Sequence, residues 1–327
     1  RPLEGAFRPG FPLPCGTMKR DRDDHHQTTA DRSYSLGGAP LTAPALAPGL
    51  HIVATPIGHL GDMTLRGLQT LAAADVIACE DTRVSRKLLD HYGIRTPLWS
   101  YHEHNAAQMR PKILARLAQG GSVALISDAG TPLISDPGYK LVRDAREAGQ
   151  NVSAAPGASS VLTALAIAGL PTDRFFFEGF LPAKTVGRRE RIATLARIPA
   201  TLVLFETGPR LAATLADLAQ GCGPREAAVC RELTKLHEEV RRADLNTLAQ
   251  HYGDTAPRGE IVIVVAPPSE AAPSSEEEID PLLREALANN SVKDAVAAVA
   301  GASGAPRKDV YRRALDIAKE RPDAAEE

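Results

Sequence analysis

Five short apolar stretches in the first half of the chain are each followed by a polar loop and then by a segment with helical periodicity. Strands that alternate with helices in this way predict an α/β domain built on a parallel, doubly wound sheet. All strands of such a sheet end at one edge, which is where ligands bind in open α/β folds. The apolar stretches lie at residues 50–54, 75–79, 98–101, 123–126 and 152–154.

The loops that follow these stretches have the composition of a binding cleft. Gly and Pro let a backbone turn tightly and approach a ligand closely. One or two such loops could arise by chance, whereas five at one sheet edge predict a cleft. They read T-P-I-G at 55–58, E-D-T-R at 80–83, H-E-H-N at 102–105, S-D-A-G-T-P at 127–132 and P-G-A-S-S at 156–160.

The longest of these loops, Ser127–Gly138, is the strongest candidate for a ligand-binding loop. Its residues are mostly Gly, Pro, Ser, Thr and Asp, and it is longer than a plain connection between a strand and a helix. Asp136 suits an N-cap and Pro137 a first helical position, so we expect the next helix to begin near Pro137. An elaborate turn that binds nothing is the alternative.

The rest of the chain divides into further units. A second set of strands, with a hairpin-like pair near Arg231–Arg242, predicts a mixed sheet. Three short helices follow, and the basic third one predicts a helix-turn-helix-like module, with a small bundle for dimer or domain packing as the alternative. The expected units are a disordered extension at 1–49, α/β domains at 50–170 and 171–267, a linker at 268–280, the helical module at 281–321 and a tail at 322–327.

The composition excludes several classes of function. The formal charge is only −2, so a nucleic-acid partner requires a local basic patch. Aromatic residues make up 4% of the chain, which argues against an RNA-recognition-motif sheet. The cysteines form no C-x-x-C pair, which predicts reduced cysteines and no metal site. No apolar run has membrane-spanning length and no signal peptide is recognisable, so we expect a cytoplasmic protein. Because residue 1 is Arg, we expect Met18 to lie nearer the start of translation.

The chemistry of the predicted cleft points away from phosphates. The chain contains no G-x-x-x-x-G-K-[ST] motif, and no G-x-G-x-x-G follows the first strand. The strand-end loops carry Pro beside Gly and almost no Lys, so they offer close backbone approach without a cage for phosphate charge. An adenosine-bearing ligand without phosphates suits this cleft, and S-adenosylmethionine is the obvious case.

Longer motifs in both α/β domains resemble those of one family. In the first domain these are T-P-I-G-x-L-x-D at 55–62, E-D-T-R, H-x-H-N and S-D-A-G-T-P-L-I-S-D-P-G at 127–138. In the second they are G-L-P-x-D-R-F at 169–175, G-F-L-P at 179–182, R-E-L-T-K at 231–235 and G-E-I-V at 259–262. The chain resembles the ribosomal RNA methyltransferases of the tetrapyrrole-methylase type. The resemblance implies S-adenosylmethionine-dependent 2′-O-methylation of a cytidine in 16S rRNA of the small ribosomal subunit, by a homodimer with the cofactor between the two domains.

The matched motifs also imply which residues form the site. Glu232 and Lys235, with Lys184 and Asp81 behind them, are candidate catalytic groups, although an ion pair between Glu232 and Lys235 that holds two strands is an equal alternative. Asp128 is expected to shape its loop. Lys184–Arg189 is expected to contact RNA phosphates, together with Arg83, Arg210 and Arg231. The implied cofactor-binding residues are Ile57, Thr131, Ile134, Ser159, Ser160, Gly259 and Glu260.

Two departures from the family pattern leave other functions open. His59 stands where the family has Asn, and residues 204–210 replace F-Y-E-S-P-H-R, so that a Tyr and a His are missing while Glu206 and Arg210 remain. One alternative is a methyltransferase for a tetrapyrrole or another small molecule. The other is a DNA-binding regulator that senses a ligand through its α/β domains.

Overall fold

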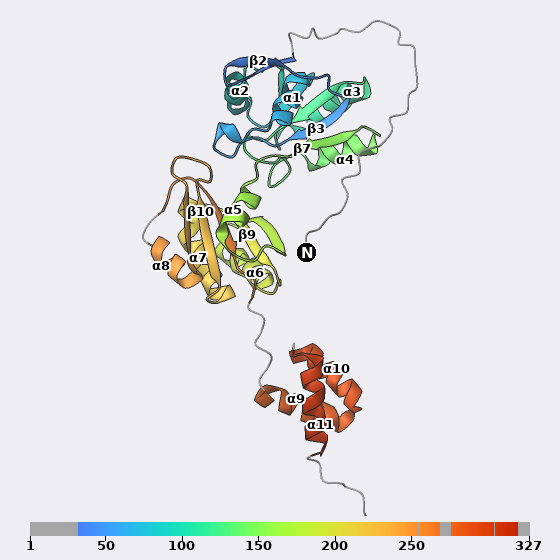
Figure 1. Ribbon diagram of the computed structural model, residues 1–327, viewed down its shortest axis with the longest axis vertical. Helices are drawn as coiled ribbons and strands as arrows, with labels where there is room; N and C mark the ends of the chain where they lie inside the picture. Colours follow the sequence, from blue (N-terminus) through green and yellow to red (C-terminus); the bar gives the residue numbers. More distant parts are fainter. Residues whose placement is uncertain (1–31, 254–255, 269–275, 304, 320–327) are drawn as a thin grey trace, which may run out of the picture.

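The computed structural model describes residues 32–253, 256–268, 276–303 and 305–319. Two α/β domains follow one another along the chain, and three helices form its last unit (Figure 1). This arrangement confirms the predicted fold class. Within the described ranges, no helix is long and apolar enough to cross a membrane.

The first domain is built on a parallel sheet with the strand order β5-β4-β6-β3-β7. The sheet is doubly wound, because one pair of helices packs on each face. Its strands are β3 (Gly49–Val53), β4 (Val76–Cys79), β5 (Leu98–Ser100), β6 (Ser122–Leu125) and β7 (Val152–Ala155). The short η2 (Leu60–Asp62), α1 (Leu65–Ala73) and α2 (Thr82–His91) precede α3 (Ala106–Ala118) and α4 (Tyr139–Glu147) in the chain.

A hairpin precedes the first domain and corrects the expectation that residues 1–49 are disordered. β1 (Ser33–Leu36) and β2 (Ala39–Thr42) pair in antiparallel fashion. Tyr34 is buried in the core beside α1 and α2, and the Ser35 amide donates a hydrogen bond of 2.6 Å to the Tyr92 carbonyl. Strands this short depend on tertiary packing, so the sequence pattern alone gives little sign of them. Residues 1–31 lie outside the described ranges.

The second domain has a mixed sheet, as predicted, with the order β11-β10-β12-β9-β8. Only β8 and β9 are parallel, and the other pairs are antiparallel. The strands are β8 (Phe175–Phe180), β9 (Thr201–Thr207), β10 (Glu226–Arg231), β11 (Glu239–Asp244) and β12 (Glu260–Val265). One face of the sheet is covered by α6 (Thr185–Leu195), α7 (Gly208–Cys222) and α8 (Leu245–Tyr252).

The other face is covered by α5 (Ser160–Ala168), which moves the domain boundary. Val161, Ala164 and Leu165 of this helix pack on the second sheet, and Arg242 Nε donates a hydrogen bond of 2.9 Å to the Ala168 carbonyl. The boundary therefore lies in the P-G-A-S-S loop and not at residue 170. The helix is apolar on nearly all sides, so its periodicity could not indicate which sheet it covers.

The C-terminal unit consists of α9 (Glu276–Asn289), α10 (Val292–Ser303) and α11 (Arg307–Lys319). The three helices share a core that includes Leu283, Val296 and Val310. The expected linker is wrong for residues 276–280, because α9 already includes them and Ile279 packs into that core. Residues 269–275 and the expected tail lie outside the described ranges.

Candidate active site

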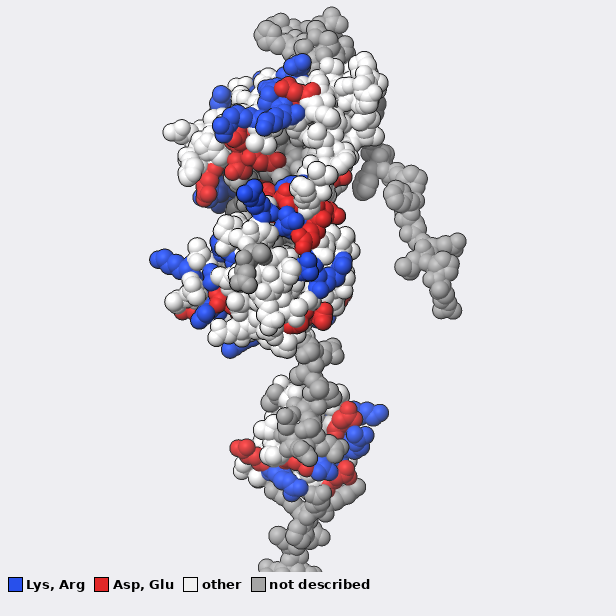
Figure 2. Space-filling model, turned by 90° about the vertical axis from the view of Figure 1, so that its left-hand side faces the viewer, with Lys and Arg blue, Asp and Glu red and all other residues white. Residues whose placement is uncertain are grey.

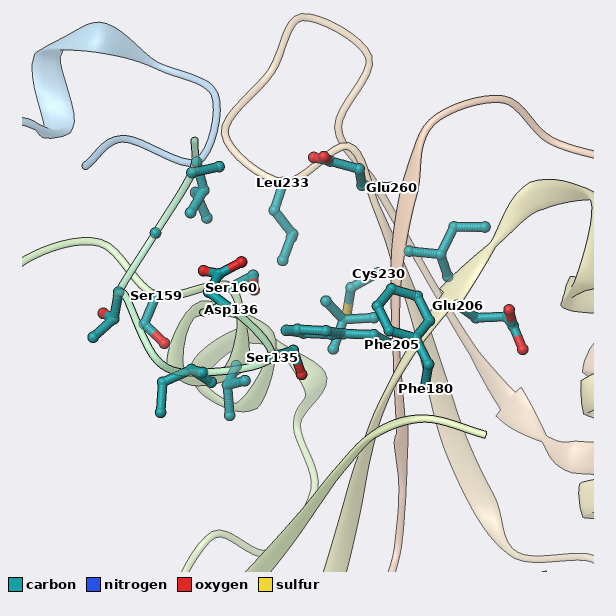
Figure 3. A pocket seen from close by; sticks show the side chains of 18 of the residues that line it. Ser135, Asp136, Ser159, Ser160, Phe180, Phe205, Glu206, Cys230, Leu233 and Glu260 are labelled. Atoms are coloured by element: carbon teal, nitrogen blue, oxygen red, sulfur yellow. The ribbon is translucent and has the colours of Figure 1, made fainter. Parts of the chain in front are cut away.

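A pocket of about 300 Å³ lies between the two α/β domains (Figure 3). Its first wall consists of the loops after β3, β6 and β7, and its second wall comes from β8, β9, β10 and β12. The E-D-T-R and H-E-H-N loops contribute no residue to it, so three of the five strand-end loops form the cleft. All seven residues implied for the cofactor site line the pocket: Ile57, Thr131, Ile134, Ser159, Ser160, Gly259 and Glu260.

The loop Ser127–Gly138 is tied to both neighbouring loops of its wall. The Thr55 amide donates to the Gly130 carbonyl (2.9 Å), and the Gly130 amide donates back (3.0 Å). The Thr131 hydroxyl donates a hydrogen bond of 3.1 Å to the carbonyl of Ala158. These hydrogen bonds fix the loop at two adjacent residues, Gly130 and Thr131, and both of them line the pocket.

The helix expected near Pro137 is present, but the cap expected at Asp136 and the first helical position expected at Pro137 are wrong. α4 begins at Tyr139, and its N-cap is Gly138, whose φ of 139° favours glycine. Asp136 therefore does not cap the helix, and its side chain lines the pocket instead. This residue was missed as a site residue, because Asp before Pro at a strand-to-helix junction is the usual pattern of a cap.

Asp136 lies among other acidic groups. Burial raises its pKa to about 6, repulsion by Glu80 and Asp128 adds to the rise, and a hydrogen bond with Ser127 opposes it. Asp128 Oδ1 accepts a hydrogen bond of 3.1 Å from the Asp81 amide, which joins two strand-end loops and agrees with its expected loop-shaping role. A half-buried carboxylate with a raised pKa in a pocket is typical of a functional group.

The second wall is apolar and aromatic. Phe180, from the G-F-L-P motif, lies edge-to-face against Phe205, with 5.6 Å between the ring centroids. Phe180 remains 51% exposed, although it lines the pocket. Phe205 stands where the resembled family has the missing Tyr. Burial raises the pKa of Cys230 to about 11, so its thiol is a neutral part of the pocket wall.

Glu232 and Lys235 form the ion pair that was the alternative to a catalytic role. Lys235 Nζ lies 2.8 Å from Glu232 Oε1 and 2.8 Å from Glu260 Oε2. Glu232 Oε1 also accepts a hydrogen bond of 3.0 Å from the Glu260 amide. The hydrogen bond from Lys235 and that backbone bond lower the pKa of Glu232. Neither Glu232 nor Lys235 lines the pocket, whereas their partner Glu260 does.

The expected basic RNA-binding segment is only partly available. Arg188 is 5% exposed, and its Nε donates a hydrogen bond of 2.7 Å to Asp217. Arg189 Nε binds the other oxygen of the same carboxylate at 2.8 Å. The expectation that Arg188 contacts RNA is therefore wrong, because its guanidinium is committed to a buried ion pair. Lys184 is exposed just before α6 and does not line the pocket.

Glu206 and Arg210 have structural partners. The Glu206 side chain is buried and points away from the pocket cavity in Figure 3. It accepts hydrogen bonds from the Thr214 hydroxyl (2.6 Å) and the Thr207 amide (2.8 Å), and it pairs with Arg210. Arg210 also donates to the Leu181 carbonyl at 2.7 Å. The two residues hold the start of α7 against Leu181, which directly follows Phe180 at the end of β8.

These features define a class: a protein of two α/β domains with a small-molecule site at their junction. Comparison with known proteins identifies the family within this class. Residues 49–249 match the family model "Tetrapyrrole (Corrin/Porphyrin) Methylases", and residues 273–318 match "RsmI C-terminal HTH domain". Among solved structures, cobalt precorrin-4 methyltransferase superposes with a TM-score of 0.53 at 20% identity, covering 66% of this chain and 94% of that one.

Curated relatives are considerably closer in sequence. Ribosomal RNA small subunit methyltransferase I from Mesorhizobium japonicum is 50% identical over 86% of this chain and 96% of its own. The protein of that name from Erythrobacter litoralis is 52% identical over 84% of this chain and 98% of its own. The chain therefore belongs to the tetrapyrrole methylases and, within them, to the family of ribosomal RNA small subunit methyltransferase I.

Proposed function

We propose that this chain transfers the methyl group of S-adenosylmethionine to a ribosomal RNA of the small subunit, and that the acceptor is the 2′-hydroxyl of a cytidine in 16S rRNA. The observation that carries the proposal is the pocket between the domains. It gathers all seven residues that the family motifs imply for the cofactor, from loops far apart in the sequence. The names of the curated relatives support the RNA as substrate.

The composition of the pocket suits S-adenosylmethionine. The charged residues that line it, among those described, are all acidic, but the Glu206 carboxylate points away and pairs with Arg210, which leaves Asp128, Asp136 and Glu260. Such a wall repels phosphates and attracts a cation. Its volume is at the lower end of the range for small-molecule sites. The bound cofactor would supply a methyl group on a positively charged sulfur, and the residues of the pocket would hold it in line with the acceptor, so positioning is a major contributor to the rate.

We propose separate roles for the three candidate catalytic residues. Glu232 and Lys235 keep Glu260 in place at the pocket and so position the second wall. Lys184, exposed four residues after Phe180, contacts an RNA phosphate. Figure 2 shows Lys and Arg side chains on the first domain and at the junction of the two α/β domains, beside acidic ones. RNA therefore meets local basic patches rather than a uniformly basic surface.

We also propose that Phe180 stacks on a base of the RNA. A large aromatic side chain that remains half exposed inside a pocket has one free face. Bases taken out of a stack are commonly received by such side chains.

The family resemblance further supports a homodimer in the cytoplasm, and analytical ultracentrifugation of the full chain tests the dimer.

The direct test of the proposed function uses small ribosomal subunits from a strain that lacks the gene. The full chain is incubated with these subunits and with S-adenosylmethionine labelled in the methyl group, and the RNA is digested to nucleosides. The proposal predicts labelled 2′-O-methylcytidine from 16S rRNA. Label in a base, in another nucleotide or in no nucleoside contradicts it.

A further inference from the structure

Most cationic side chains of the second domain that lie near the pocket are already paired with a carboxylate. Arg210 Nε lies 3.2 Å from Glu206 Oε1, and Arg231 Nη2 lies 3.0 Å from Glu239 Oε2. A phosphate must compete with such a carboxylate for the cation, so these side chains are poor candidates for phosphate contacts. The paired cations are Arg188, Arg189, Arg210, Arg231 and Lys235.

Helix α2 of the first domain has an excess of cations over carboxylates. Its first two turns carry Arg83, Arg86 and Lys87, whereas its one carboxylate, Asp90, comes near its end. Arg83 is paired at 2.6 Å with Asp81, the residue that caps the helix. Arg86 and Lys87 have no ion-pair partner in the parts of the chain that the structure describes. Their charge is therefore available to a ligand.

α2 begins at the rim of the pocket. It directly follows the E-D-T-R loop, at the sheet edge where the strands of the first domain end. The Asp81 amide of this loop donates a hydrogen bond of 3.1 Å to Asp128, which lines the pocket. An α-helix rises about 1.5 Å per residue, so Lys87 lies only about 8 Å along the helix from its first residue, Thr82.

The three cations share the outer side of the helix. Arg86 and Lys87 follow Arg83 by three and four residues, which makes them neighbours on one helical face. Arg83 has a side chain that is 88% exposed, and Lys87 is exposed as well. Ser85 and Leu89 are buried on the opposite face. α2 lies on the left of the first domain in Figure 1, so its side of that domain faces the viewer in Figure 2, where Lys and Arg side chains gather beside acidic ones.

We propose that Arg83, Arg86 and Lys87 form the surface of the first domain on which the phosphates of the acceptor RNA dock, an inference that rests on the proposed function. The acidic lining of the pocket repels phosphates, and the cations at its rim attract them, so the RNA backbone runs outside the pocket across α2. The E-D-T-R loop contributes no residue to the pocket, and its role is to place the start of α2 at the rim. With Lys184 on the second domain, both domains then contact the RNA.

The test is equilibrium binding of the full chain to small ribosomal subunits from a strain that lacks the gene, at several salt concentrations. S-adenosylhomocysteine is present, so that no methyl transfer occurs. The double variant Arg86→Ala, Lys87→Ala should raise the dissociation constant roughly tenfold or more and reduce the slope of log affinity against log salt by about one to two. Its affinity for S-adenosylhomocysteine should equal that of the wild type.

Arg146→Ala is the matched control. Arg146 is exposed in the last turn of α4, at the sheet edge opposite to the pocket, so this variant should bind the subunits as the wild type does.

The outcomes separate the docking surface from the proposed function. An unchanged affinity and salt slope in the double variant, or an equal loss in Arg146→Ala, overturns the docking surface. So does a loss of affinity for S-adenosylhomocysteine, because α2 then shapes the cofactor site. A loss for whole subunits with unchanged affinity for deproteinised 16S rRNA also overturns it, because α2 then contacts a ribosomal protein.

Two further results remain decisive. If the double variant does not fold, Lys87→Ala alone, at an exposed position, must show a smaller change of the salt slope in the same direction, and an unchanged slope overturns the docking surface. A wild-type chain that binds subunits through α2 but transfers no methyl group to a ribose refutes the proposed function and supports the docking surface.

Discussion

The backbone amide of His59 donates a hydrogen bond of 3.1 Å to the hydroxyl of Thr234 and so joins the two α/β domains directly. Each partner of this hydrogen bond lies close in sequence to a residue of the pocket lining. Ile57 lies two residues before His59 in the first domain, and Leu233 directly precedes Thr234 in the second. Docking of the loop that carries Thr234 on the turn that carries His59 therefore sets the width of the pocket on one side.

Gly58→Ala should disturb this docking. A Cβ at residue 58 would lie 2.5 Å from Lys235 Cγ and 3.0 Å from the Leu233 carbonyl oxygen, too close for either to remain in place. We expect the dissociation constant for S-adenosylhomocysteine, measured by calorimetry, to rise at least tenfold. Gly301→Ala, where an added Cβ meets nothing within 4 Å, is the control. Equal affinities of the two variants would show that the contact does not shape the pocket.

Glu232→Gln should lower stability in a pH-dependent way. The folded pKa of Glu232 is depressed, so its contribution is complete above the ordinary value of 4.5 and is lost as pH falls through the folded pKa. We expect the variant to be about 1 kcal/mol less stable than the wild type at pH 7, with the difference closing below pH 4.5. Urea unfolding at pH 7 and pH 4 measures it. A constant difference across this range contradicts the ion-pair account.

Arg188→Ala should act on stability. Removal of Arg188 leaves Asp217 with Arg189 as its remaining ion-pair partner, so the cost should approach but not exceed the value of about 3–5 kcal/mol for a fully uncompensated buried charge. The salt dependence of RNA binding by the folded fraction should stay as in the wild type. If the variant instead showed a smaller slope of log RNA affinity against log salt and no loss of stability, Arg188 would contact RNA after all.

Lys184→Ala should have the opposite pattern. Its side chain is exposed, so stability should change by less than about 0.5 kcal/mol. Loss of one phosphate contact should reduce the slope of log affinity against log salt by about one. Lys140→Ala, on the exposed side of α4, is a matched lysine control. The same slope in both variants rules out the proposed contact.

Phe180→Ala should weaken RNA binding more than cofactor binding. Loss of a base-stacking contact costs about 1–3 kcal/mol, which corresponds to a five- to 150-fold rise in the KM for RNA. Phe180→Tyr keeps the ring and should retain most of the affinity. If alanine raised the dissociation constant of S-adenosylhomocysteine instead, the ring would belong to the cofactor site.

The sheet edge could be predicted from the sequence, because Gly and Pro at strand ends mark where a parallel sheet binds ligands. The individual pocket residues were implied only by the resemblance of the longer motifs to those of the family. The burial of Arg188 could not be predicted, because its partner Asp217 lies 29 residues away on another helix. Asp136 was hidden for a similar reason: the local pattern Asp-Pro-Gly fits a helix cap, and only the fold shows that the helix starts at Tyr139. Local signals locate the site, but tertiary packing decides which charged groups are free.

The claim that the pocket between the domains holds the cofactor is tested most directly by titration of S-adenosylhomocysteine into the full chain and into Ile134→Asp. Ile134 lines the pocket and is 43% exposed, so the substitution should leave the fold intact. Val84→Asp, at a residue 40% exposed on α2, is the control. The account predicts one site per chain, wild-type affinity in the control and at least a tenfold loss in Ile134→Asp. Unchanged affinity in Ile134→Asp would contradict it.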